Sequence, residues 1–181
     1  SEKILAAFGT DYQKNIHTLR SWTNMSGPID LNSKSRDTDM TFSNIGVFGE
    51  LTYSATEKDR ILSGLRGDFL RVENEKSTAT GANTNSNDEM YGGFVRYEHD
   101  IASTSTTVYA GLGHAQRPAD WCDRNRDFFL TPEKANQIDA GVIYSGAKLR
   151  ASTSLFVARI DDFILSRNNN TARNIDAETY G

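Results

Sequence analysis

The sequence lacks several features that would assign a chain to a class at once. Its single cysteine, Cys122, excludes an internal disulfide and a cysteine-based zinc cluster. No apolar run approaches the ~18 residues that a membrane-spanning helix needs, but a spanning strand needs only about ten, and alternation dilutes its hydropathy. The net charge is −4 and the basic residues are scattered, which argues against a nucleic-acid partner. Hydrophobic residues make up 37% of the chain, which is low for a packed soluble core.

The sequence has instead a two-residue alternation, which is clearest from Thr131 to Leu165. Successive side chains of a strand point to opposite sheet faces, so alternation predicts a strand with one apolar face. The Ser145-Gly146 pair is a turn signal between two such arms. The apolar phase holds Ile138, Ala140, Val142 and Tyr144 in the first arm, and Leu149, Ala151, Thr153, Leu155 and Val157 in the second.

The same pattern recurs along the chain and predicts an all-β antiparallel sheet of seven to eight strands. Long polar segments and tight turns alternate between the strands, so all the long loops should lie at one end of the sheet. Outer-membrane barrels have this asymmetry, whereas soluble sandwiches with Greek-key crossings do not. The expected strands are 3–12, 41–55, 60–72, 90–98, 106–114 and the two arms of 131–165, with an eighth segment that barely begins.

The aromatic residues divide by position, which supports a transmembrane β-barrel wall over a soluble β domain. Two rows of outward aromatics on either side of an aliphatic band are typical of a lipid-facing wall. We interpret the apolar phase as lipid-facing and the charged phase as lumen-facing. The aromatic girdle would comprise Tyr53, Tyr97 and Tyr144 at the tight turns and Phe8, Tyr12, Phe69 and Tyr91 at the long loops; the lumen would be lined by Arg66, Asp68, Arg96, Glu98, Asp139 and Arg150.

The soft metal ligands are few. Thioether, thiol and imidazole groups suit copper, and Met25, Met40 and Cys122 fall in the predicted long loops, so these residues and His17 are candidate ligands. Ordinary scatter of three methionines explains the same pattern, and we prefer that interpretation. No Ser/His/Asp spacing indicates a hydrolase, and His99 and Asp100 would point to opposite faces, so we expect no enzyme activity.

Several segments resemble one family. The run from Leu130 to Gly141, with its Pro132-Glu133 pair, is similar to a late strand of TonB-dependent receptor barrels, and Phe156 to Leu165 resembles the strand that follows. Within that family the chain resembles the copper-receptor branch. That likeness is carried by Pro132-Glu133-Lys134, Gln137, Asp139, Gly141 and Asp162 to Leu165, together with Asp11-Tyr12-Gln13, Asn15, His17 and Arg20.

The resemblance implies an outer-membrane barrel of about 22 strands in a Gram-negative cell, filled by an N-terminal plug domain. Uptake of copper, or of another metal or metal chelate, would be energised by TonB acting through that plug. Residues 1–181 would be part of the wall and its extracellular loops, without the plug and without a bound cofactor. The charged lumen residues would then contact the plug, and lipid would contact the other face. The family's Cys-x-x-x-Met and His-x-Met copper motifs do not occur here, so no metal ligand can be transferred.

The alternative is a complete, small eight-stranded outer-membrane barrel with an adhesion or structural role. The length of the chain suits it. A closed barrel of eight strands would need its last strand in full, because no open sheet edge can lie in lipid.

Overall fold

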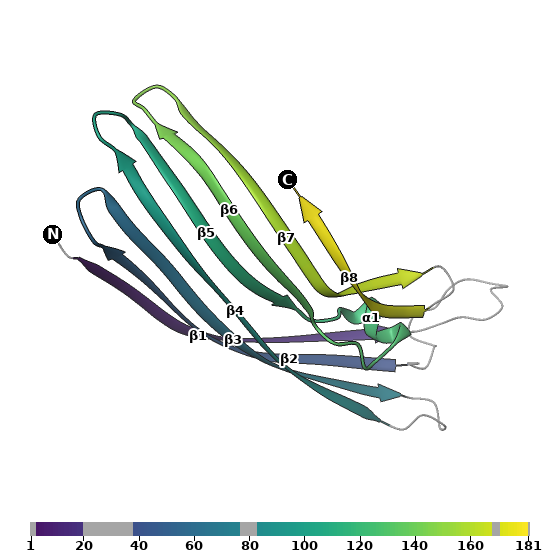
Figure 1. The fold of residues 1–181 in the computed structure, drawn as a ribbon. Helices are drawn as coiled ribbons and strands as arrows, with labels where there is room; N and C mark the ends of the chain where they lie inside the picture. Colours follow the sequence, from purple (N-terminus) through teal and green to yellow (C-terminus); the bar gives the residue numbers. More distant parts are fainter. Residues whose placement is uncertain (1–2, 20–37, 77–82, 168–170, 181) are drawn as a thin grey trace.

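The computed structural model describes residues 3–19, 38–76, 83–167 and 171–180, and these form a single antiparallel sheet. Each strand pairs only with its neighbours in sequence, in the order β1 to β8 (Figure 1). The described strands β1 and β8 do not pair with each other, so the sheet is open. The strands are β1 (Ile4–Leu19), β2 (Thr38–Ser54), β3 (Asp59–Lys76), β4 (Thr84–Ile101), β5 (Thr106–Arg117), β6 (Glu133–Ser145), β7 (Arg150–Arg167) and β8 (Thr171–Tyr180).

The tight turns lie at one end of the sheet, as the sequence predicts (Figure 1). Residues 55–58, 102–105 and 146–149 are the three turns, each of four residues. At the opposite end the strands run further than predicted. The β3–β4 hairpin continues to Lys76 and Thr84, because polar residues can keep pairing beyond an apolar band.

Two more details of the loop end differ from the sequence prediction. The connection between β7 and β8 comprises only residues 168–170, so it is not a long loop, and β8 is a strand of ten residues. The segment between β5 and β6 contains an unpredicted helix, α1 (Trp121–Arg126), whose N-cap Asp120 accepts a hydrogen bond from the Asp123 amide. No helix among the described residues is long and apolar enough to cross a membrane.

The register places the two predicted phases on opposite faces of the sheet. We call the face with Ile4, Phe8 and Leu65 the apolar face, and the face with Arg66 and Asp139 the ionic face. Phe8 is 92% exposed and Leu65 is 76% exposed, so no second layer of described residues covers the apolar face. A soluble two-layer protein would bury these side chains.

The apolar band crosses the strands at an angle. On its loop side the band ends at the directly paired Lys14, Ser43 and Arg71 in β1–β3, and at His114, Asn136 and Arg159 in β5–β7. The row of His114, Asn136 and Arg159 continues across β4, β3 and β2 through Gly93, Leu65 and Gly49, and it reaches β1 at Phe8. Phe8 is six residues before Lys14, so the boundary moves six residues over the six steps from β1 to β7, an average of one residue per step.

A shift of one residue per strand gives the tilt of the wall. With a rise of about 3.3 Å per residue and a strand spacing of about 4.8 Å, the tilt is about 35°, as in transmembrane barrels. Ile4 to Lys14 on β1 and Tyr144 to Asn136 on β6 then span about 22–27 Å along the membrane normal, close to the ~25 Å of a barrel's apolar band. The fold is therefore a stretch of transmembrane β-barrel wall.

The two hydrophobic clusters of the described residues lie at the loop end of the ionic face. One cluster joins Met40, Leu70, Val72 and Met90 to Phe42, Trp121 and Phe128, and a second contains Ala119, Leu130, Ile164 and Ala172. The α1 segment supplies the cover for the first cluster. Met40 is therefore in β2 and fully buried, not in a long loop as predicted, because the extended β2 carries it under Trp121.

Candidate functional site

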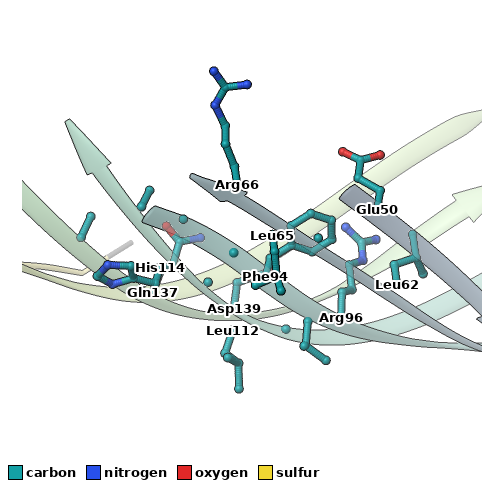
Figure 2. Close-up of a pocket in the computed structure, with 18 of the residues that line it drawn as sticks. Glu50, Leu62, Leu65, Arg66, Phe94, Arg96, Leu112, His114, Gln137 and Asp139 are labelled. Carbon is teal, nitrogen blue, oxygen red and sulfur yellow. The ribbon is translucent and has the colours of Figure 1, made fainter. Parts of the chain in front are cut away.

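On the ionic face, Glu50, Arg66 and Arg96 border a concavity of about 840 Å³ across the middle of β2 to β6, and its lining also includes Leu65, Val95 and Leu112 of the apolar face. Glycines at 92, 111 and 113 leave part of its floor without side chains, and Phe48 and Phe94 lie beside them. Figure 2 shows Arg66 and Glu50 on one side of the sheet and Leu112 on the other. Of the six residues predicted to line the lumen, all lie on this face, but only Arg66, Arg96 and Asp139 line the concavity.

Arg66 links three strands on this face. Its guanidinium donates to both carboxylate oxygens of Asp11 on β1, at 2.7 and 3.0 Å, and to both of Asp68, at 2.7 and 2.6 Å. Asn44 of β2 donates to Asp68 at 2.7 Å. Bidentate arginine–carboxylate pairs fix orientation as well as charge, so this cluster sets the relative positions of β1, β2 and β3.

Gly46 makes the Arg66 cluster sterically feasible. It lies on β2 directly between Asp11 and Asp68, which are its partners on the two neighbouring strands. A Cβ at this position would overlap Arg66 Nη2 and lie 2.8 Å from Asp11 Oδ1. Because Gly46 has no side chain, the Arg66 guanidinium can cross β2 and reach Asp11 on β1.

We expect Gly46→Ala to displace the Arg66 guanidinium and to lower the melting temperature of the full-length protein. Overpacking by one methyl group costs about 1–3 kcal/mol. Gly49→Ala is the matched control, because a Cβ at Gly49 meets only the Ala7 carbonyl oxygen at 3.8 Å. Thermal unfolding followed by heat-modifiable electrophoresis measures both variants, and equal melting temperatures for the two would contradict the role of Gly46.

A second ionic cluster lies near the tight turns. Arg60 of β3 contacts Asp100 at 2.6 Å and Glu98 at 3.1 Å, both on β4. Arg96 contacts Glu98 at 2.8 Å and lies 3.7 Å from the Tyr109 ring centroid, a cation–π arrangement. Arg96 and Glu98 are among the residues predicted to line the lumen, whereas Arg60 and Asp100 are not, although both are in the charged phase.

Aromatic side chains on the ionic face cover glycines of adjacent strands. Phe48 lies over Gly9, Phe94 over Gly64 and Tyr109 over Gly141, each pair being direct register partners. A Cβ at Gly9 would be 2.6 Å from the Phe48 ring. Sequence reasoning did not single out these aromatics. In the sequence, each of these residues is an aromatic side chain in the charged phase of its strand. The glycine that it covers is identified only by the register between the strands.

The α1 segment is fixed to the wall by a buried ion pair. Arg124 is 2% exposed and donates to the Asp88 carboxylate on β4, to the Phe128 carbonyl at 2.8 Å and to the Ala119 carbonyl at 3.3 Å. Asp88 lies on the loop side of the apolar band. Burial raises the pKa of Asp88, and the charge of Arg124 opposes that shift.

The Pro132-Glu133 motif stabilises the irregular part of β7. Glu133 is 8% exposed and accepts from Arg117 Nε and from the Ile164 amide, both at 2.7 Å. Ile164 follows a register shift between Ile160 and Phe163, where Asp162 has a φ of 59°. The Asn174 amide binds the Thr131 backbone as a strand partner would, donating to its carbonyl at 3.1 Å and accepting from its N–H at 3.3 Å.

Glu133 also lies beyond the apolar band, on the loop side. Burial favours its neutral form, but the hydrogen bonds from Arg117 and Ile164 outweigh that effect and hold the pKa of Glu133 below its usual value. Glu133 is therefore ionised at neutral pH and acts as a structural anchor.

The candidate metal ligands are not brought together. Met40 is buried, Cys122 is exposed on α1, and His17 stacks on Trp121 with ring centroids 5.8 Å apart. Met25 lies outside the described residues. Within the part of the chain that the structure describes, no group of three or more His, Cys, Asp or Glu residues is placed to hold a metal ion.

The seven predicted girdle aromatics all lie on the apolar face. At the turn end the Tyr97 hydroxyl donates to Asp59, and His99 Nδ1 lies 2.8 Å from the same carboxylate. Asp100 is on the opposite face with Arg60, so His99 and Asp100 form no pair. Contact of these aromatics with lipid remains a prediction.

The comparisons with known proteins agree with this geometry. The copper transporter OprC is 36% identical, with a TM-score of 0.84 over 98% of this chain and 30% of that one. The ferric yersiniabactin receptor FyuA from Yersinia pestis (18% identity, TM-score 0.77, 100% of this chain and 29% of that one) and the ferric-catecholate receptor Fiu from E. coli K12 (14%, 0.74, 98% and 32%) share the fold.

The chain thus spans about a third of the length of these structures. No curated protein sequence matches it. The family model for the β-barrel of TonB-dependent receptor-like proteins matches residues 3–181. The chain belongs to the TonB-dependent receptor β-barrel family.

Proposed function

We propose that this chain is part of the barrel wall of an outer-membrane receptor in a Gram-negative cell. This receptor takes up copper, or another metal or metal chelate, and TonB energises the uptake. The wall itself performs no catalysis. Its apolar face contacts lipid, its ionic face contacts a plug domain, and TonB acts through that plug.

The observation that carries this proposal is the division of charge between the two faces. Arg66, Arg96 and Asp139 lie on one face beside a concavity, while the other face carries an exposed apolar band of membrane thickness. Ionic groups that already have partners within the wall can still exchange water for polar groups of a plug. The bare glycine backbone between them lets another domain approach closely.

Copper is proposed as the transported ion because the copper transporter OprC is 36% identical over 98% of this chain. The described residues contain no group of three or more His, Cys, Asp or Glu residues that could hold a metal ion, and in this proposal the copper ligands lie outside these residues. Copper is therefore a transported substrate in this proposal and not a resident cofactor of the wall.

The test compares copper, iron chelates and cobalamin with the full-length receptor. We expect Cu(I) or Cu(II) to bind the purified receptor, and we expect cellular copper at limiting supply to fall when either the receptor or TonB is deleted. Binding of an iron chelate without copper would contradict copper as the substrate, and copper uptake that is unchanged without TonB would contradict TonB as the energy source.

The eight-stranded barrel is the weaker candidate. It requires β1 to pair with β8, and the described residues of these strands form no such pair. An open sheet edge is excluded from lipid, and in our proposal further strands complete the wall.

A further inference from the structure

The α1 segment, residues 118–132, contacts both edge strands of the described sheet. The Trp121 ring stacks on His17 of β1 with ring centroids 5.8 Å apart, and the Asn174 side chain of β8 makes two hydrogen bonds to the Thr131 backbone. Helix α1 also approaches β8 to within 8 Å, Cα to Cα. The segment therefore joins the first and the last strand of this part of the wall (Figure 1).

This connection requires the wall to curve around α1. Seven strand spacings of about 4.8 Å separate β1 from β8 along the sheet, a path of about 34 Å. Helix α1 has six residues, which span about 9 Å. Even when the stacked rings at one end and the 8 Å approach at the other are added, the route through α1 is shorter than the route along the wall. The α1 segment thus crosses the concave side of the wall as a chord.

The chord is also held between its two ends. Arg124 is buried and binds the Asp88 carboxylate of β4, and Trp121 packs on the first hydrophobic cluster. Ala119 and Leu130 belong to the second cluster, together with residues of β7 and β8. Because these contacts would have to break together, the α1 segment is a fixed element of the mouth and not a swinging loop.

A slot of about 420 Å³ lies between the α1 segment and the wall, and we call it the inner slot. Gln13 and Asn15 of β1 line one side of it, and residues 117–121 line the other. Six water molecules of about 30 Å³ each occupy roughly 180 Å³, so a hydrated metal ion fits the inner slot. A chelate with a bulky organic shell around the ion does not.

The polar groups of the inner slot suit the water shell of an ion. Asp68 already binds Arg66 and Asn44 through its carboxylate, so it is not a free ligand that would trap the ion. Gln13 and Asn15 are exposed, and their amide oxygens can accept hydrogen bonds from coordinated water. An ion can therefore enter the slot and leave it without losing its shell.

From this arrangement we propose that the α1 segment selects by size what reaches the wall beneath it. A hydrated metal ion enters the inner slot, and a bulky chelate is excluded. The long loops of such barrels face outward, so the selection acts at the mouth. This inference rests on the proposed function, and it favours a metal ion over a chelate as the cargo that passes along these strands.

The test labels a cysteine in the inner slot of the full-length receptor on intact cells, using Gln13→Cys with Cys122→Ser. The probes are N-ethylmaleimide and a polymer-linked maleimide, and each rate is normalised to that of the exposed Cys122 in the unchanged protein. We expect the small probe to react and the bulky probe to be excluded. Adding Arg124→Leu should raise the rate of the bulky probe roughly tenfold or more, because labelling follows the population of the opened segment.

Arg126→Leu is the matched control, because Arg126 is an exposed arginine of the same helix, and it should leave the bulky probe excluded. Trp121→Ala is a second release variant, which frees the segment from β1 and should also admit the bulky probe. Heat-modifiable electrophoresis checks that each variant folds.

Three results would overturn the proposal: equal normalised rates for the two probes at Gln13→Cys, no reaction of the small probe there, or an equal gain in Arg124→Leu and Arg126→Leu. Labelling needs no cargo and no TonB. A failure of copper uptake would therefore leave this result unaffected.

Discussion

Replacement of Arg124 by leucine is expected to release the α1 segment from the wall. The guanidinium is nearly inaccessible to solvent, and it binds the buried Asp88 carboxylate and two backbone carbonyls of its own loop. The substitution leaves Asp88 as an uncompensated buried charge. Breaking a buried ion pair from one side costs about 3–5 kcal/mol. A loss of that size exceeds what the small cluster around Trp121 can offset.

Hydrogen exchange and limited proteolysis of residues 118–132 in the full-length receptor would measure this release. Arg126→Leu is the control, because Arg126 is an exposed arginine of the same helix. The double variant Arg124→Leu with Asp88→Leu should recover part of the protection, since it removes both charges. If Arg124→Leu and Arg126→Leu gave equal protection, the ion pair would have no anchoring role.

Replacement of Glu133 by leucine is expected to have the second-largest effect, at the irregular part of β7. The Ile164 amide would lose its acceptor in a buried setting, which costs about 1–3 kcal/mol, and Arg117 would lose its ion pair. The residues around Asp162 should therefore open more often than the rest of the strand. Faster exchange of the Ile164 amide and a lower melting temperature are the expected readouts.

Lys134→Gln is the control for this prediction. Lys134 contacts Asp162 at 2.8 Å, but both side chains are more than a third exposed, and exposed pairs contribute about 0–1 kcal/mol. Glu133→Gln keeps an acceptor and should fall between the two. If the Ile164 amide exchanged at the same rate in Glu133→Leu as in the unchanged protein, the amide would have another hydrogen-bond acceptor and the prediction would be wrong.

The Glu133 contact also has a pH dependence. Its pKa is lower in the folded state than in the unfolded chain, so its contribution to stability is complete above the unfolded value. The contribution is lost as the pH falls through the lowered folded value. The Ile164 amide should therefore stay protected at neutral and mildly acidic pH and lose protection only in stronger acid, while Glu133→Leu should show no such transition.

The candidate metal ligands show where sequence reasoning fails. Met40 follows a long polar run, which is a loop signal, yet pairing with β3 extends β2 through it and α1 buries it. Polarity outside the band does not end a hairpin, because backbone hydrogen bonds continue in water. The sequence does not predict α1, because a helix of six residues is too short to show a helical period of apolar residues.

The sequence by itself determined the two faces of the sheet, the strands, the turn end and the aromatic rows, because alternation is a local property of two-residue period. The tertiary structure alone decided what depends on register. Arg66 reaches Asp11 only because Gly46 lies between them, and Arg124 meets Asp88 only when the α1 segment folds back onto β4. Such contacts join residues tens of positions apart, and no local pattern encodes that distance.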